Sequence, residues 1–345
     1  MIALHLGNWA RFATRLLGEA PVRALVEAPL RGALGGLISL AWALEPRPPP
    51  PRDLVVIVGH QRSGTTWLHR MLASHPSATA LPLHALLLPI DPLQRWLGRR
   101  AAPPWLDRVE ERLFGPLRPI HRIGFREHEE DEFLLWTLCR SRMGALDRPW
   151  RRPPEIRLQD DDLRCYAHAV GAAQARAGRR IVGKNPHATT RIPALRAAIP
   201  GVRLVQLVRH PVEAICSRLS LIRAIWRRQI PGFQEMNAAQ VARIVDYSCE
   251  IYLAGHGSAD LDVAYADLIA DPLGTVQHIH ATLGLEPWPS AALAALGAHQ
   301  RSGPSAHRYG PEDFGLDPEV LARKLAPIYD RWGFEVRPAP TRSKY

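Results

Sequence analysis

The sequence predicts an α/β domain, a parallel sheet flanked by helices, that follows a helical N-terminal extension. Two observations support this prediction. Short runs of branched apolar residues, each bounded by turn residues, are typical of strands buried in a parallel sheet. Stretches with helical periodicity lie between these runs, and strands that alternate with helices indicate a parallel sheet.

Residues 1–45 are predicted to form a helical, amphipathic extension, because Trp9, Phe12 and Leu16 recur at helical spacing. Pro21 and Pro29 are expected to divide this stretch into short pieces. The longest uncharged apolar stretch near the start of the chain, 32–44, has 13 residues. A spanning helix needs about 20, so no transmembrane helix is predicted. Residues 1–44 fit two interpretations, a helical lid packed on the core or an interfacial helix in peripheral contact with a membrane.

A proline-rich connector, 46–52, separates the extension from the main domain, 53–337, and residues 338–345 form a tail. The predicted strands are residues 54–58, 180–183, 204–208 and 261–265. The predicted helices between and after them include residues 66–73, 131–139, 211–228 and 238–253.

Composition and charge exclude several classes of protein. The chain of 345 residues has a formal net charge of +11, and 41 of its 44 basic residues are Arg. This charge makes an anionic ligand plausible, but no basic stripe with interleaved aromatic residues indicates nucleic-acid binding. The four cysteines are far apart and form no CxxC pair, so neither a zinc site nor a disulfide framework is expected. Charged residues interrupt the start of the chain, which does not fit a signal peptide and indicates a cytoplasmic or membrane-peripheral protein.

The clearest motif follows the first predicted strand and reads Gly-His-Gln-Arg-Ser-Gly-Thr-Thr-Trp over residues 59–67. A strand, a glycine turn and a helix start present backbone N–H groups and a positive dipole end to an anion. The spacing is close to that of the P-loop of nucleotide-binding proteins, GxxxxGK[ST]. Thr65 stands where that motif has Lys, although an ATP site needs this Lys at the β- and γ-phosphates. A loop with Arg62 and two threonine hydroxyls suits a terminal phosphate instead.

A second motif begins where another predicted strand ends. Arg209 follows the strand at 204–208, and Pro211 is a favourable first residue for the next helix. Ligands of open α/β sheets bind at the carboxyl ends of strands, and a magnesium-dependent NTPase would place a carboxylate there. An arginine at this position favours a second anionic group and no metal ion. Ser217, two helical turns further on, could share that anion, whereas a pair between Arg209 and Glu213 is the structural alternative.

Together these segments resemble the sulfotransferase family, most closely its bacterial and tyrosylprotein types, over residues 54–334. The run 62–67 resembles the loop that holds the 5′-phosphosulfate of 3′-phosphoadenosine-5′-phosphosulfate (PAPS). Arg209 and Ser217 resemble the pair that binds the 3′-phosphate. Lys184 follows a predicted strand where similar sulfotransferases place a lysine beside the transferred sulfuryl group. The resemblance implies that PAPS is bound by Arg62, Ser63, Gly64, Thr65, Thr66, Trp67, Arg209 and Ser217, and that Arg62 and Lys184 also act in catalysis.

The group that accepts the acceptor's proton is predicted to be His84. Several relatives carry a glutamate further along the chain from the loop arginine, and in this region His84 is the nearest titratable residue. An imidazole can take a proton near neutral pH. The alternative is the acidic cluster at 127–132, in which Glu129 or Glu130 could serve. Acidic residues at a helix start also stabilise the helix without any chemistry.

The predicted function is transfer of a sulfuryl group from PAPS to an acceptor hydroxyl or amine, with release of 3′,5′-ADP. The acceptor would be a small molecule, a lipid-like molecule, or a glycan or peptide. Two alternatives stay open: a P-loop kinase that uses ATP and Mg²⁺, and a non-catalytic protein that binds 3′,5′-ADP.

Overall fold

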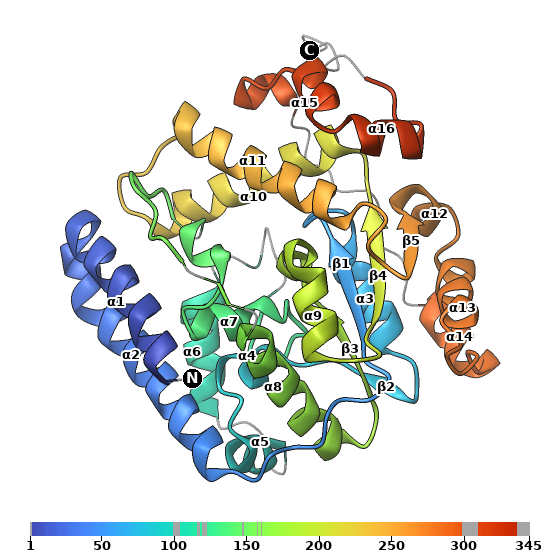
Figure 1. Ribbon diagram of the computed structural model, residues 1–345, viewed down its shortest axis with the longest axis horizontal. Coiled ribbons are helices and arrows are strands. Elements are labelled where there is room, and N and C mark those ends of the chain that lie inside the picture. The colour runs from blue at the N-terminus through green and yellow to red at the C-terminus, as the bar shows by residue number, and fades with distance from the viewer. Residues whose placement is uncertain are drawn as a thin grey trace.

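A computed structural model describes residues 2–98, 104–115, 118, 123–146, 148–156, 158–159, 161–298 and 310–336. Its centre is a sheet of five strands in the order β2-β3-β1-β4-β5, and all neighbouring strands are parallel (Figure 1). The strands are β1 (Val55–Gly59), β2 (Ala78–Thr79), β3 (Arg180–Lys184), β4 (Arg203–Val208) and β5 (Leu261–Ala264). The predicted parallel sheet flanked by helices is confirmed. Only β2, two residues long, was not predicted, because it is too short to show any periodicity.

Helices cover both faces of the sheet. Leu54, Val56 and Val58 point into a core that they share with one set of helices, whereas Val55 and Ile57 point into the core on the other side. Successive side chains of a strand alternate between faces, so a strand covered on both sides is apolar throughout. This burial explains the uninterrupted apolar run from which β1 was predicted.

The helices form three groups around the sheet (Figure 1). The first face is covered by α4 (Leu83–Leu87), α7 (Glu132–Thr137), α8 (Asp161–Ala177) and α9 (Ile192–Ala198). The second face is covered by α3 (Thr65–Ala73), α12 (Tyr265–Ala270), α13 (Pro272–Thr282) and α14 (Ser290–Ala298). A third cluster surrounds Val208 at the end of β4 and contains α10 (Pro211–Gln229), α11 (Ala238–Gly255), α15 (Pro318–Lys324) and α16 (Ala326–Trp332).

The N-terminal extension is a helical hairpin of α1 (Ile2–Glu19) and α2 (Pro21–Leu44). Trp9 donates from Nε1 to the carbonyl of Ala28 at 2.6 Å. Gly32 makes room for this indole, since a Cβ there would lie 2.9 Å from Trp9 Nε1. Ile38 and Trp42 of α2 belong to the buried core of the main domain. The hairpin therefore packs on the core through one face of α2.

The prediction that prolines divide the extension into short pieces is wrong for Pro29, which lies inside the continuous helix α2. A proline in a helix interior costs about 3 kcal/mol because it removes one hydrogen bond and crowds the preceding turn. The buried side chains before and after it, Ala24, Ala28, Ile38 and Trp42, offset that cost. They share one face only if the helix continues through Pro29.

The continuity of α2 also changes the expectation about membrane-spanning length. Residues Val22–Leu44 form a 23-residue stretch that could cross a membrane by length and composition alone, and 33% of its most apolar window is buried within the structure. A helix in the core of a domain, or a signal sequence, would meet the same criterion. The predicted tail at 338–345 lies outside the described residues.

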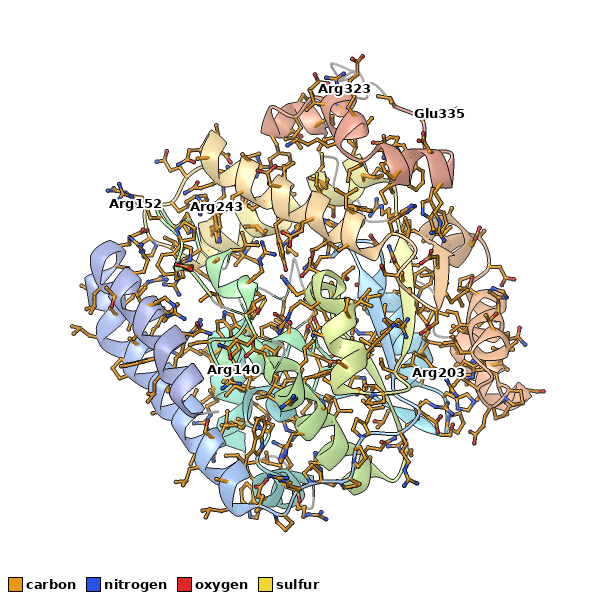
Figure 2. The ribbon with its side chains drawn as sticks, viewed as in Figure 1. Arg140, Arg152, Arg203, Arg243, Arg323 and Glu335 are labelled. Atoms are coloured by element: carbon orange, nitrogen blue, oxygen red, sulfur yellow. The ribbon has the colours of Figure 1, made fainter. Side chains whose placement is uncertain are left out.

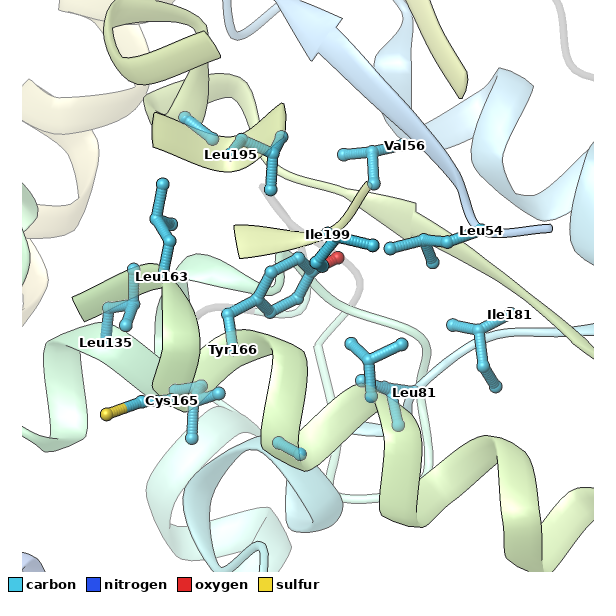
Figure 3. Packing of buried hydrophobic residues seen from close by; sticks show 14 of the residues in the cluster. Leu54, Val56, Leu81, Leu135, Leu163, Cys165, Tyr166, Ile181, Leu195 and Ile199 are labelled. Carbon is cyan, nitrogen blue, oxygen red and sulfur yellow. The ribbon is translucent and has the colours of Figure 1, made fainter. Parts of the chain in front are cut away.

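The core between the sheet and the helices of its first face contains a hydrogen-bonded polar pair. Tyr166 is fully buried among the aliphatic side chains shown in Figure 3, and its hydroxyl donates to Asp131 Oδ2 at 2.6 Å. Gly183 of β3 faces this pair. A Cβ at Gly183 would lie 2.5 Å from the Tyr166 hydroxyl and closer still to Asp131 Oδ2. Only glycine fits here, because the two oxygen atoms occupy the space of a side chain.

We expect Gly183→Ala to lower the free energy of unfolding by about 1–3 kcal/mol, because the new methyl group must displace buried, hydrogen-bonded oxygen atoms. Denaturant unfolding of the purified protein measures this loss. The matched control is Gly36→Ala in α2, where a Cβ would meet nothing within 4 Å. Replacing a helical glycine in open space should raise stability by up to about 1 kcal/mol. Equal stability of the Gly183→Ala variant and the native chain would contradict the close approach.

Candidate active site

The loop at 60–64 leaves β1 in the middle of the sheet and leads directly into α3. β1 lies between β3 and β4, so the loop stands where the chain order reverses, the usual ligand position in such sheets. Two glycines bound the loop. Gly59 has φ +105°, and a Cβ there would lie 2.7 Å from the carbonyl of Leu207; Gly64 has φ +90° and approaches the ring of Tyr265 as closely. The glycines of the motif are therefore required by backbone conformation and by packing.

The helix α3 begins at Thr65, and the loop supplies its cap at Gly64 without any side-chain hydrogen bond. Amide groups of a first helical turn have no acceptor within the helix, and the helix dipole adds positive potential there. Ser63 and Thr65 are buried beside this turn, while Thr66 and Trp67 are half-buried. The predicted anion-binding residues thus surround one helix N-terminus.

Arg62 connects the loop to the second motif. Its φ of +71° is in the left-handed region, which costs a non-glycine residue about 1–3 kcal/mol and is commonest at functional sites. Its Nε donates to Ser217 Oγ at 3.1 Å, and its carbonyl accepts from Arg209 NH1 at 3.1 Å. The structure therefore joins three predicted residues that are far apart in the sequence, and it places the Arg62 side chain on the side of Ser217.

Arg209 makes several contacts at the end of β4. Its Nε and NH2 both lie 3.1 Å from Glu213 Oε2, so the structural alternative considered for it is realised. Its guanidinium group also lies over the Tyr265 ring, 4.7 Å from the centroid, and its carbonyl accepts from the hydroxyl of Tyr252 at 2.8 Å. These contacts keep the guanidinium beside Arg62 and Ser217. Two arginines and one hydroxyl form a positively charged group with one carboxylate at its edge.

Lys184 occupies the carboxyl end of β3, next to β1. Its side chain is fully buried, and Nζ donates to Thr66 Oγ1 at 2.9 Å. Within the described part of the chain its ion-pair partner is Glu130, whose Oε1 lies 3.8 Å from Nζ. The structure thus brings the predicted site residue Lys184 to the first turn of α3. No direct contact joins Lys184 to Arg62 among the described residues.

The backbone of Lys184 is held by Asp131. The Asp131 amide donates to the Lys184 carbonyl at 2.8 Å, and the Lys184 amide donates to Asp131 Oδ2 at 3.1 Å. Burial raises the pKa of Asp131 from 3.8 to about 7, against the opposing effects of the Tyr166 hydrogen bond and the Lys184 charge. Sequence reasoning gave Asp131 no role, because a carboxylate at a predicted helix start normally stabilises only its own helix.

The acidic cluster at 127–132 separates into different environments. Glu127 pairs with Arg70 at 3.5 Å, whereas Glu129 and Glu132 are buried. Burial raises the pKa of Glu132 to about 7. Glu130 is 21% exposed and forms the ion pair with Lys184. It is thus the member of the cluster that both contacts Lys184 and reaches solvent.

His84 lies in α4 and is half-buried. Its backbone amide donates to the carbonyl of Phe125 at 2.9 Å, and Gln94 donates to its carbonyl at 3.4 Å. Burial lowers the pKa of the imidazole, and the charges of Arg176 and Arg126 lower it further. The described contacts do not link His84 to Lys184 or to the loop at 60–64.

A layer beneath the loop was not predicted from the sequence. Gln61 Nε2 lies 2.9 Å from His187 Nε2, and His187 Nδ1 lies 2.8 Å from the Tyr247 hydroxyl. His60 stacks on Tyr252 with ring centroids 5.0 Å apart. Burial lowers the pKa of both histidines well below the ordinary value, so both are neutral at pH 7. No local pattern could reveal this layer, since Gln61 and His187 are 126 positions apart.

Across the described ranges, no three His, Cys, Asp or Glu side chains are gathered in a way that could hold a metal ion. The four cysteines are buried and unlinked to one another. Cationic side chains, a helix N-terminus and carboxylates gather at this edge of the sheet.

Comparison with known proteins gives consistent results. A model of the sulfotransferase family matches residues 54–290. The omega-hydroxy-beta-dihydromenaquinone-9 sulfotransferase Stf3 of Mycobacterium bovis is 26% identical over 257 residues, as is the protein of the same name from Mycobacterium tuberculosis. These matches cover 67% of this chain but only 62% of the length of the curated relatives.

Two solved structures share the fold. The sulfotransferase STF9 from Mycobacterium avium superposes with a TM-score of 0.69 at 17% identity, over 89% of this chain and 84% of that chain. The sulfotransferase STF1 from Mycobacterium tuberculosis superposes with a TM-score of 0.64 at 22% identity, over 93% of this chain and 92% of that chain. At such identities the likeness concerns the fold.

The raised pKa of Asp131 predicts how the free energy of unfolding changes with pH. Because the folded state holds this proton more tightly than the unfolded chain, stability falls as pH rises from about 4 to about 7. We expect Asp131→Asn to flatten this fall in the free energy of unfolding, measured by urea denaturation at pH 5 and pH 8. The variant should keep part of the dependence of unfolding free energy on pH, because the pKa of Glu132 is raised in the same way. As a control, Asp53→Asn alters an exposed carboxylate and should keep the native slope; an unchanged slope in Asp131→Asn would show that this carboxyl is not the source.

Proposed function

The chain belongs to the sulfotransferase family, and from that premise we propose that it transfers a sulfuryl group from PAPS to an acceptor hydroxyl or amine and releases 3′,5′-ADP. One observation supports the proposal above all others. Two cationic sites, Lys184 with the N-terminus of α3 and Arg209 with Arg62, lie at the carboxyl ends of β3 and β4, on either side of β1. A nucleotide with anionic groups on both its 5′ and 3′ oxygens would use both sites.

Each site has a distinct role in this proposal. The first-turn amides of α3, with Ser63, Gly64, Thr65, Thr66 and Trp67 around them, would hold the 5′-phosphate. Arg209 and Ser217 would bind the 3′-phosphate, and Arg62, which donates to Ser217, would add a second positive charge at that position. Glu213 shares the Arg209 guanidinium, so the incoming phosphate would replace a carboxylate rather than water as its partner.

The arginine at the end of β4 distinguishes this proposal from the kinase alternative. A kinase of the P-loop class needs a loop lysine at the β- and γ-phosphates and a carboxylate that helps to hold Mg²⁺. Here Thr65 replaces that lysine, and Arg209 stands where the carboxylate would be. Both replacements favour a nucleotide with a 3′-phosphate over ATP with Mg²⁺.

The chemistry would depend mainly on positioning and electrostatics. The acceptor oxygen would bond to sulfur as the bond from sulfur to the 5′-phosphate oxygen breaks, and the acceptor proton would pass to a protein base. Lys184 would stabilise the negative charge that develops on the leaving oxygen. Its burial strengthens that effect, because surrounding water screens a buried charge less.

Two groups are candidates for the base. The sequence favoured His84, whereas the geometry favours Glu130, because this carboxylate is partly exposed and lies 3.8 Å from the Lys184 ammonium. A base beside the cation that stabilises the leaving group would be close to both reacting oxygens. We therefore propose Glu130 for this role and keep His84 as the competing prediction.

For the acceptor we propose a hydroxyl group on a lipid-like molecule. The curated relatives are named for a hydroxylated menaquinone derivative, and the same chemical class would suit this chain. The first substrates to test are therefore apolar alcohols, with a glycan or peptide hydroxyl as the comparison.

The nucleotide assignment predicts a selective loss in Arg209→Ala. Affinity for 3′,5′-ADP should fall by about 10–100-fold, the value of a lost charge-assisted hydrogen bond, while affinity for 5′-AMP, which has no 3′-phosphate, should hardly change. Titration calorimetry measures both. The native chain should also bind 3′,5′-ADP more tightly than ATP with Mg²⁺.

Arg203→Ala is the matched control for this experiment. Arg203 begins the same strand at its opposite end, where it pairs with Asp53, and its removal should leave both affinities unchanged. If ATP with Mg²⁺ bound more tightly to the native chain, the kinase alternative would replace the proposal. Equal losses of 3′,5′-ADP and 5′-AMP binding would make Arg209 a structural residue.

The base assignment predicts that Glu130→Gln lowers turnover by about 10²–10⁴-fold, the usual effect of a positioned general base, with little change in 3′,5′-ADP affinity. Steady-state rates with a confirmed acceptor test this. Glu127→Gln is the control within the same cluster, because Glu127 pairs with Arg70 instead. His84→Ala is measured in parallel, and loss of turnover there with an active Glu130→Gln variant would assign the proton to His84.

A further inference from the structure

The outward face of α2 is apolar along its whole length. The exposed positions of this helix are occupied by Val, Leu, Pro, Ala and Gly only, without a polar or charged side chain. Seven large side chains on this face, here called the outer stripe, are between 50% and 79% exposed. The outer stripe consists of Val22, Leu25, Val26, Leu30, Leu37, Leu40 and Leu44.

The charged residues of α2 point the opposite way. Arg23 donates to the carbonyl of Gln229, and Glu27 pairs with Arg148 at 2.5 Å. Arg31 is buried, with its guanidinium 3.8 Å from the centroid of the Trp136 ring. A surface helix of a water-soluble domain normally shows the reverse arrangement, with its apolar face inward and its charges outward. The lack of any polar or charged side chain at the exposed positions of α2 indicates that the outer stripe meets an apolar environment.

Exposed apolar side chains are concentrated in this part of the molecule. Of the 17 large hydrophobic residues that are exposed in the described ranges, 13 lie on α1, α2, α5 (Asp91–Gly98) and α6 (Pro104–Phe114). They include Trp96 and Trp105, and tryptophan is enriched where proteins meet the membrane–water interface. The start of α5 adjoins the end of α2, since Glu45 accepts from the Asp91 amide at 3.0 Å. Large apolar patches of this kind mark interaction sites.

Basic side chains gather at one end of the outer stripe. Glu19, at the turn between α1 and α2, accepts hydrogen bonds from the amides of Arg151 and Arg152, and both arginine side chains are exposed. Figure 2 shows Arg152 at this margin of the molecule, beyond the hairpin. Arg228 is exposed beside Gln229, which Arg23 contacts. An apolar face with arginines at its end is complementary to a lipid surface that carries phosphate groups.

We propose that the outer stripe of α2 docks this protein on an anionic lipid bilayer. The inner face of α2 stays bound to the core through Ile38 and Trp42, and Trp42 Nε1 donates to the carbonyl of Pro89 at 2.8 Å. The helix therefore lies in the plane of the interface and does not cross the bilayer. Its 24 residues extend over about 36 Å. Such a helix inserts its apolar side among the lipid chains while the basic end meets the headgroups.

The usefulness of this docking rests on the proposed function, since a lipid-like acceptor would be collected directly from the bilayer. The docking itself does not depend on it. The test below uses neither nucleotide nor acceptor, so a protein that binds vesicles but transfers no sulfuryl group would refute the activity alone.

The experiment is co-sedimentation of the purified full chain with vesicles of phosphatidylcholine, or of equal parts of phosphatidylcholine and phosphatidylglycerol. We expect binding to the anionic vesicles, weakened by salt. A variant that combines Leu30→Gln, Leu37→Gln and Leu40→Gln should bind at least about tenfold more weakly. These side chains project into solvent, so thermal unfolding should stay unchanged and show that the variant is folded.

The matched control combines Leu253→Gln, Ile269→Gln and Val320→Gln, three exposed apolar residues on α11, α12 and α15. It should bind anionic vesicles as well as the native chain. A second variant, Arg151→Gln with Arg152→Gln and Arg228→Gln, should lose the preference for phosphatidylglycerol without touching the stripe.

Three results would overturn the proposal. The native chain could ignore both vesicles, or the outer-stripe variant could bind as tightly as the native chain. Light scattering could also show a dimer that the outer-stripe variant converts to monomers, in which case a second copy of the chain covers this face.

Discussion

The hydrogen bonds that join Asp131 to the end of β3 are the constraint on which the site depends. Asp131 exchanges two hydrogen bonds with the backbone of Lys184, and its carboxylate also accepts from Tyr166. Gly183 must be glycine because these oxygen atoms fill the space of a side chain. The hydrogen bonds of Asp131 fix the backbone of Lys184 so that its side chain extends toward Thr66 and Glu130. A buried carboxylate with a raised pKa is costly, and its retention is understandable if it holds a buried ammonium group in one position.

The parallel sheet explains why distant segments meet. β1, β3 and β4 run in the same direction, so their carboxyl ends lie along one edge. The loop after β1, Lys184 at the end of β3 and Arg209 after β4 are therefore neighbours although they come from separate parts of the chain. Arg62 then connects the loop to Ser217 and Arg209. The electrostatic stabilisation that such a site provides depends on where its charges are held. Fixed geometry is therefore more important here than any one residue type.

The two faces of α2 in the N-terminal hairpin are in different environments. The inner face of α2 gains from packing on the core strongly enough to keep the helix continuous through Pro29. The exposed apolar side chains of its outer face are not stabilised by burial in the protein, and their contact with water is unfavourable. The lid and the interfacial helix, which were alternatives in the sequence, thus describe opposite faces of one helix: the first interpretation fits the inner face, and the lipid surface is our proposal for the outer one.

Local pattern alone determined much of this protein. Short runs between turn residues located four of the five strands to within a residue at each end, and the run at 59–67 located the loop. The signal is clearest for β1, since burial of all its residues leaves an uninterrupted apolar run. Tertiary structure decided what depends on distance in space. It showed that α2 continues through Pro29, that Asp131 and Tyr166 hold the end of β3, and that Glu130 rather than another carboxylate of its cluster pairs with the Lys184 ammonium group. These outcomes come from contacts between residues widely separated along the chain, or from the sum of many packing energies, and neither leaves a periodic signal in the sequence.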